Sequence, residues 1–165
     1  MNGFNISEAG HAIPILLPQN ITGGANGLIF SMKGAAHVSI LISVGALAAQ
    51  LGAVTVNACQ TQSGTGATAI GFRYYKQTTA GAGNDTLSGP TVATTAGFTP
   101  ANTPNVLYVI ELDASELESL GDSDGADYPY LQVAFANGAN ADYVSAVAVL
   151  SGLRQQYQGN PSQTV

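Results

Sequence analysis

The chain contains few of the residues that support chemistry. Its 165 residues include no tryptophan, one cysteine, two histidines and only four lysines and arginines. One cysteine cannot form a disulfide within the chain, and one cysteine with two histidines cannot complete a structural zinc site. With so few basic residues and a formal net charge of −6, the sequence argues against binding to nucleic acid, which needs Lys and Arg opposite phosphates.

Charge of either sign is scarce. Charged residues make up 8% of the chain, against roughly 25% in an ordinary soluble domain. The surface must therefore consist mainly of Ser, Thr, Asn, Gln, Ala and Gly. This is a sparse surface for a protein that stays a free monomer.

The apolar stretch 38–56 has no charge and is long enough, at about 19 residues, to cross a membrane. It contains serines, Gln50 and two glycines, and it lacks flanking aromatic anchors, so we interpret it as two strands and expect no membrane segment. The N-terminus has no basic region before an apolar core, so we expect no secretion signal.

Apolar and polar residues alternate with period two in about eight short runs, separated by turn-forming segments such as 63–66, 80–85, 99–104 and 137–140. This pattern predicts a single all-β domain, a sandwich or a barrel. The expected strands are 28–32, 38–44, 54–59, 70–76, 91–95, 106–112, 130–136 and 143–150.

One short helix is expected near residues 113–120. Asp113 can cap its first turn, Glu116 completes a capping box, and Gly121 offers a left-handed end.

The two ends differ from the predicted domain, 28–154. We interpret 1–27 as an extended N-terminal arm and 155–165 as a polar C-terminal tail. The arm has one apolar cluster and the tail one aromatic residue, which we expect to contact neighbouring subunits or another protein. These candidate contacts are Ile13, Ile15, Leu16, Leu17 and Tyr157.

Catalytic signals are weak. There is no Gly-x-Ser-x-Gly elbow, and neither His11 nor His37 has a sequence context that suggests a partner. We interpret both as ordinary surface or strand-end histidines and Cys59 as a buried structural thiol. The sequence thus predicts no enzyme and no cofactor.

Seven of the ten acids lie between Glu111 and Asp127. Within this region Asp122, Asp124 and Asp127 surround a glycine and are a weak candidate for a calcium site, although the spacing departs from the helix-loop-helix calcium motif. The alternative is a solvated acidic turn.

Two of the four basic residues lie in the run Arg73-Tyr74-Tyr75-Lys76. Aromatic and basic residues together can bind single strands or sugars. In an acidic protein we prefer an exposed, interface-prone strand edge, with Tyr74 and Tyr75 as candidate contacts.

Three segments together, 105–117, 130–135 and 142–154, resemble the decoration (cement) proteins of tailed-bacteriophage capsids. They contain Asn105-Val106-Leu107-Tyr108-Val109-Ile110-Glu111-Leu112-Asp113, then Tyr130-Leu131-Gln132-Val133-Ala134-Phe135, then Asp142-Tyr143-Val144-Ser145-Ala146-Val147. The resemblance implies a β-sandwich of jelly-roll type. It also implies a homotrimer bound to the major capsid protein.

On this reading the chain is a structural virion protein, made in the host cytoplasm and placed on the outer capsid surface. Small residues would allow tight subunit contacts, and many weak symmetric contacts would stabilise the shell. Two alternatives stay open: a phage tail or head-to-tail joining protein, and a carbohydrate- or calcium-binding β-sandwich module.

Overall fold

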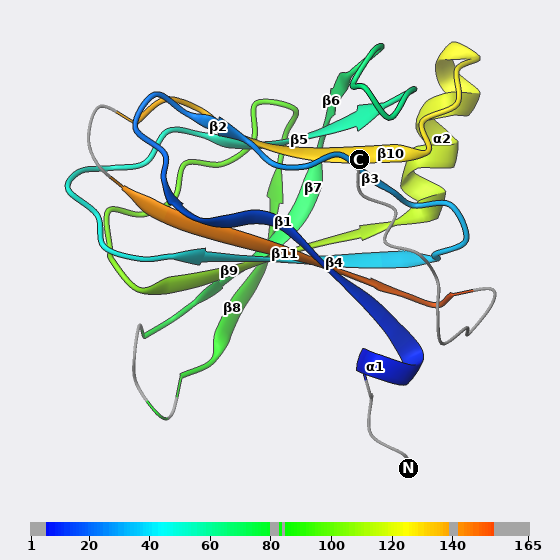
Figure 1. The fold of residues 1–165 in the computed structure, drawn as a ribbon. Helices are drawn as coiled ribbons and strands as arrows, with labels where there is room; N and C mark the ends of the chain where they lie inside the picture. Colours follow the sequence, from blue (N-terminus) through cyan, green and yellow to red (C-terminus); the bar gives the residue numbers. More distant parts are fainter. Residues whose placement is uncertain (1–5, 80–82, 84, 139–141, 154–165) are drawn as a thin grey trace.

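A computed structural model describes residues 6–79, 83, 85–138 and 142–153, which form two packed antiparallel sheets (Figure 1). This confirms the predicted all-β sandwich. The elements are α1 (Ile6–Ala9), β1 (Gly10–Asn20), β2 (Ala25–Asn26), β3 (Phe30–Ser31), β4 (His37–Val44), β5 (Val54–Cys59), β6 (Thr68–Ile70), β7 (Phe72–Gln77), β8 (Leu87–Ala93), β9 (Val106–Asp113), α2 (Ala114–Asp124), β10 (Tyr130–Phe135) and β11 (Tyr143–Ser151).

The first sheet has the order β1-β11-β4-β9-β7-β8 and the second the order β2-β10-β5-β6, with β3 also pairing with β10. Without the β7–β8 hairpin, each sheet has four strand positions, and the chain crosses repeatedly from one sheet to the other. This is the strand order of a jelly roll. The hairpin extends the first sheet beyond β9.

The N-terminal segment is part of the sandwich, which corrects the expectation that 1–27 form an arm outside a domain beginning at residue 28. β1 pairs along its length with β11, and β2 pairs with β10. Ile13 and Ile15 are each only 1% exposed. Proline is tolerated in β1 because this strand is at the sheet edge, where one side of the backbone needs no partner.

The interior is formed by the inward-facing side chains of both sheets. In β4 they alternate strictly with outward-facing ones, so Val38 and Ile40 are fully buried. The uncharged stretch 38–56 therefore does divide into two strands, β4 and β5. Cys59 is fully buried as predicted, and burial raises the pKa of its thiol. Within the described residues, no helix is long and apolar enough to cross a membrane.

An aromatic cluster fills the interior beside β7. The ring of Tyr74 stacks on Phe98 with centroids 4.1 Å apart, and Phe72 and Tyr108 pack around them. Phe98 also pairs with the backbone of Val54 at the start of β5. The cluster therefore joins the hairpin of the first sheet to the second sheet.

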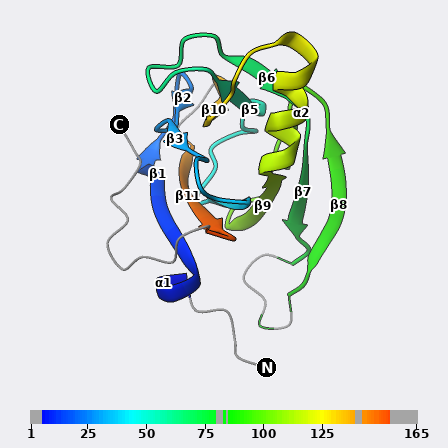
Figure 2. The ribbon, with the colours of Figure 1, turned by 90° about the vertical axis from the view of Figure 1, so that its right-hand side faces the viewer.

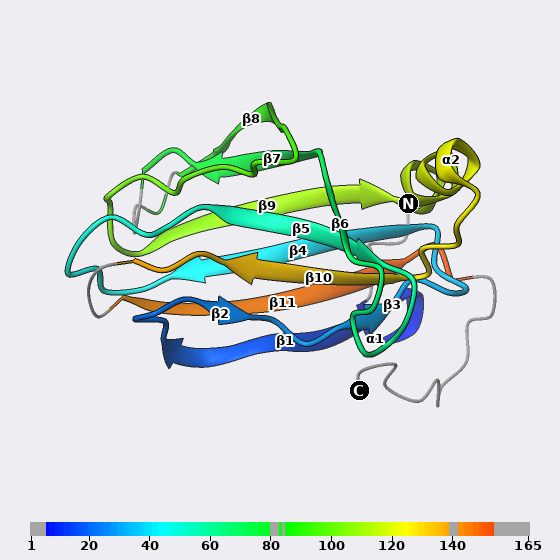
Figure 3. The same cartoon turned by 90° about the horizontal axis from the view of Figure 1, so that it is seen from above.

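The predicted short helix is α2, which lies at one end of the sandwich after β9 (Figure 3). Its capping box is present: the backbone N–H of Asp113 donates to Glu116 Oε2 over 2.9 Å. The predicted end at Gly121 is wrong, because α2 continues to Asp124 and ends at the left-handed Gly125. Gly121 is needed for space instead, since a Cβ there would lie 2.4 Å from the carbonyl oxygen of Ala126.

Candidate functional site

The outward face of the six-stranded sheet carries an apolar row that crosses five strands. Strand register places Pro14 (β1) opposite Val147 (β11), Val147 opposite Leu41 (β4), Leu41 opposite Val109 (β9), and Val109 opposite Tyr75 (β7). Side chains directly opposite each other share a face of a sheet. We call these five residues the apolar row.

On one side of the apolar row, the neighbouring outward residues are uncharged. Ser145, Ser43 and Leu107 form the next row across β11, β4 and β9. Tyr143, near the end of this face, is 52% exposed. Apart from one cluster beside α2, the described outward residues of these strands carry no charge, which leaves a broad sheet face suited to contact with another protein.

Both edges of this sheet oppose the addition of another strand. The two edge strands, β1 and β8, lie on opposite sides of the molecule (Figure 2). β1 contains Pro14 and Pro18, and β8 contains Pro90. Proline has no backbone N–H to donate to a ladder, and natural edge strands use it to block pairing. If this sheet contacts another protein, the contact is therefore favoured at its face and not at its edges.

The charged cluster on the same face is centred on His37. Its Nδ1 lies 2.7 Å from Asp113 Oδ1, and its Nε2 lies 2.6 Å from Glu111 Oε2. Arg73 Nη2 donates to Asp113 Oδ2 over 3.4 Å and lies 3.9 Å from Glu116 Oε1. The cluster ties β4, β9 and β7 to the first turn of α2.

The two carboxylates determine the protonation of His37. Partial burial by itself favours the neutral ring, but the hydrogen bonds to Asp113 and Glu111 and their negative charges outweigh it and raise the pKa of His37. Only the protonated ring can donate to both carboxylates at once, which is why their presence favours the cation.

Ser39 brings a hydroxyl to this cluster, so that the residues resemble a Ser-His-Asp arrangement. The Ser39 hydroxyl, however, donates to Glu111 Oε2 over 2.7 Å and lies 3.5 Å from His37 Nε2. A general base needs a free lone pair directed at the nucleophile. Here Glu111 occupies that nitrogen, so the geometry describes an ion cluster and does not activate Ser39.

We expect the cluster to stabilise the fold more at low pH than at high pH. In the unfolded chain His37 titrates near its ordinary value of 6.5, and in the fold its pKa is raised. Its contribution is therefore complete below pH 6.5 and is lost as the pH rises through the folded pKa. Urea unfolding of the wild type and of His37→Gln at pH 6 and pH 8.5 measures this. The destabilisation caused by the substitution should be larger at pH 6, and an equal loss at both pH values would contradict the assignment.

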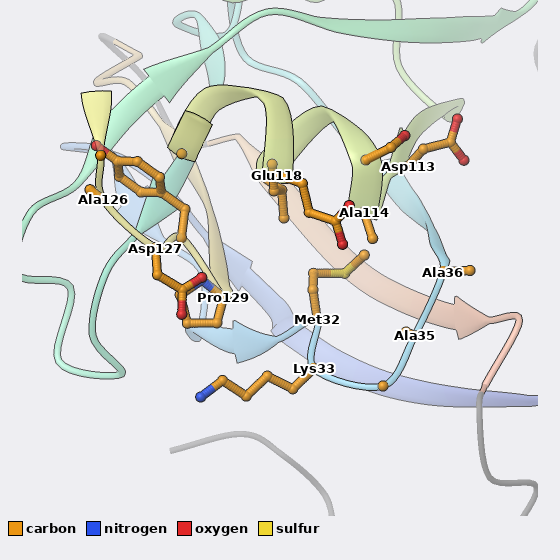
Figure 4. A pocket seen from close by; sticks show the side chains of 16 residues that line it. Met32, Lys33, Ala35, Ala36, Asp113, Ala114, Glu118, Ala126, Asp127 and Pro129 are labelled. Atoms are coloured by element: carbon orange, nitrogen blue, oxygen red, sulfur yellow. The ribbon is translucent and has the colours of Figure 1, made fainter. Parts of the chain in front are cut away.

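A cleft of about 1120 Å³ separates α2 from the segment that joins β3 to β4 (Figure 4). Met32, Leu117 and Tyr128 are its largest apolar lining residues, and all three are buried. Most of the remaining lining consists of small residues, namely Gly34, Ala35, Ala36, Ala114, Ser115, Gly121, Gly125 and Ala126. Small walls permit close approach of another backbone.

The candidate calcium residues do not lie in one loop. Asp122 and Asp124 belong to the last turn of α2, whereas Asp127 follows Gly125 and is exposed. Residues 122–124 are therefore helical, where a turn was expected. Within the part of the chain that the structure describes, no group of three or more His, Cys, Asp or Glu side chains is arranged to hold a metal ion.

The predicted contact residues fall into three groups. Ile13, Ile15 and Leu16 are buried in the chain's own core, which corrects their assignment as contacts, and Tyr74 likewise packs on Phe98 inside the sandwich. On the surface are Leu17, which is 67% exposed, and Tyr75, which is half-buried at the end of the apolar row. Tyr157 and the predicted tail lie outside the described residues.

Sequence reasoning missed both the apolar row and the His37 cluster. A partial signal was present: His37 with Ser39, and Glu111 with Asp113, are pairs spaced by two, which places each pair on one strand face. The register of β4 against β9 is what brings them together.

Comparisons with protein-family models, with curated proteins and with solved structures find no match for this chain.

Proposed function

We propose that this protein is a structural virion protein that binds the outside of a tailed-phage capsid and stabilises it. The observation that carries the proposal is the outward face of the six-stranded sheet, where the apolar row crosses five strands between edges blocked by proline. A jelly roll with little surface charge and a largely uncharged sheet face is suited to many repeated contacts on a symmetric shell.

The partners in this proposal are the major capsid protein and further copies of the chain, in a homotrimer. Val147 is the member of the apolar row on β11, and it is 36% exposed. Because the row is uncharged and continuous, it can be covered by a protein surface without desolvating an ion. The His37 cluster lies at the end of the face, where a polar rim is normal for an interface.

The test measures binding to expanded capsids that lack this protein, by sedimentation and mass photometry. We expect the wild type to be a trimer and to saturate the particles at hundreds of copies. In Val147→Lys a charge would have to be desolvated in each contact, so the affinity for the particles should fall by about tenfold or more, which corresponds to about 1.4 kcal/mol per contact. Ala67→Lys, at an exposed position in the loop before β6 of the second sheet, is the control away from this face and should bind normally.

Other outcomes overturn the proposal. A wild-type monomer that ignores capsids would exclude decoration. A few copies at a single vertex would indicate a joining protein, and binding of calcium or glycans by the isolated protein without capsid binding would indicate a ligand-binding module. Thermal unfolding of both lysine variants shows whether any loss of binding is a loss of folding.

A further inference from the structure

The loop that follows β10 contains an Asn-Gly pair, in which the glycine has no Cβ to hinder attack of its own nitrogen on the asparagine side chain. The sequence has three such pairs, at 2–3, 26–27 and 137–138, and the first lies outside the described residues. In each of the other two the asparagine is exposed and the glycine is buried. Burial therefore does not distinguish these two pairs, but their surroundings do.

The pair Asn26-Gly27 is held by the second sheet. Asn26 belongs to β2 and lies opposite Ala134 of β10. The Gly27 N–H donates to Val133 O over 2.8 Å, and Gly27 O accepts from Gln132 Nε2 over 3.1 Å. Both polar groups of this glycine are bound to β10, so its nitrogen is not available to attack the Asn26 side chain.

The side chain of Asn137 is held in a different way. Its Oδ1 accepts a hydrogen bond from the Gly23 N–H over 3.1 Å, and Gly138 forms a bridge with Thr22. An N–H directed at Oδ1 stabilises the negative charge that develops on this oxygen when a nucleophile adds to Cγ. The fold thus activates the Asn137 side-chain carbonyl.

Asp142 places a carboxylate beside Gly138. Its side chain is fully buried, and Oδ1 accepts from the N–H groups of Ala48 and Ala49 over 2.8 and 3.3 Å. Its Oδ2 has no hydrogen-bond partner among the described residues and lies 3.1 Å from the position that a Cβ on Gly138 would occupy. A buried oxygen without a donor is costly. A carboxylate in this place can accept the Gly138 amide proton, directly or through one water.

We propose that Asn137-Gly138 is a site of self-modification, with the Gly23 N–H as oxyanion donor and Asp142 as base. The Gly138 nitrogen gives its proton to Asp142 and bonds to Asn137 Cγ. The bond from Cγ to Nδ2 then breaks, and Nδ2 leaves as ammonia with the proton that Asp142 returns. Water opens the resulting succinimide at either carbonyl and leaves aspartate or isoaspartate at position 137. This inference does not rest on capsid binding.

The test compares the two described pairs in the folded and the unfolded full-length chain. The protein is incubated at neutral pH with and without guanidinium chloride, and peptide mapping by mass spectrometry measures succinimide, aspartate and isoaspartate at positions 26 and 137. We expect folding to slow the reaction at Asn26 several-fold and to accelerate it several-fold at Asn137. Slowing at both positions would overturn the proposal, and this comparison needs no variant.

Asp142→Asn tests the base. The new side chain keeps an oxygen that can accept from Ala48 and Ala49, but an amide does not take up a proton at neutral pH. The folded variant should react several-fold more slowly at Asn137, while its unfolded chain should react like the unfolded wild type. Asp127→Asn, at an exposed position beside α2 (Figure 4), is the control and should react at the wild-type rate. An unchanged rate in a folded Asp142→Asn protein would refute the role of Asp142.

Discussion

Replacing Ile15 with aspartate is expected to abolish cooperative folding, whereas the same substitution at Leu17 is expected to change stability by no more than about 0.5 kcal/mol. Both residues belong to one apolar cluster on β1, but Ile15 is 1% exposed and Leu17 is 67% exposed. An unpaired carboxylate in the core costs several kcal/mol even after relaxation, which is comparable to the whole stability of a domain, about 5–15 kcal/mol.

Urea unfolding followed by circular dichroism measures this pair. A folded Ile15→Asp protein with near-wild-type stability would contradict the assignment of β1 to the core and restore the interpretation of 1–27 as an arm. The Leu17→Asp protein has a second use, because it stays folded. Loss of its occupancy on capsids would identify Leu17 as a contact of the assembled particle.

The strands that sequence predicted well are those with strict alternation. Val38, Ile40 and Ile42 alternate with the less buried Ser39, Leu41 and Ser43, and all three are fully buried in β4. The helix start was also predictable, because a capping box is a local signal carried by Asp113 and Glu116.

β1 was missed because its signal conflicts with itself. Pro14 and Pro18 argue against a strand, and the cluster between them runs without alternation. The position of β1 at the sheet edge resolves the conflict, because the proline nitrogen, which has no hydrogen to donate, can face away from the neighbouring strand. Edge position depends on the whole sheet order and cannot be inferred from the local sequence.

The candidate surfaces depend on contacts that are distant in sequence. The apolar row joins residues from Pro14 to Val147, and the His37 cluster joins β4 to β9 across more than 70 residues. A shift of one residue in either register would move each of these side chains to the opposite face. The sequence therefore indicated the kind of fold, while the register determined which residues share a surface.

Among the glycines, we expect the largest effect of substitution at Gly97. This residue lies in the turn that follows β8, where the chain packs against Val54 at the start of β5. Gly97 has φ +75°, and a Cβ there would lie 2.0 Å from the carbonyl oxygen of Val54. That backbone is held in place, because Val54 and Phe98 exchange two hydrogen bonds of 2.8 and 3.1 Å. A methyl group must therefore separate the turn from β5 and disturb the stack of Phe98 on Tyr74.

Gly97→Ala is expected to destabilise the protein by more than about 3 kcal/mol, and Gly125→Ala by about 1 kcal/mol. Gly125 is the matched control because its φ of +74° is nearly the same, while nothing lies within 4 Å of its Cβ position. Both substitutions introduce the same left-handed strain, so the difference between their free energies of unfolding measures the collision with Val54 and Thr55 on β5. Equal losses would mean that the turn can move away from β5 at little cost, and that the Phe98 stack does not hold the two sheets together. A large difference would show that the turn holds Phe98, and through the ring stack Tyr74 on the inner side of β7, in a fixed position. Tyr75 follows Tyr74 on the same strand, so its position at the end of the apolar row would be fixed as well.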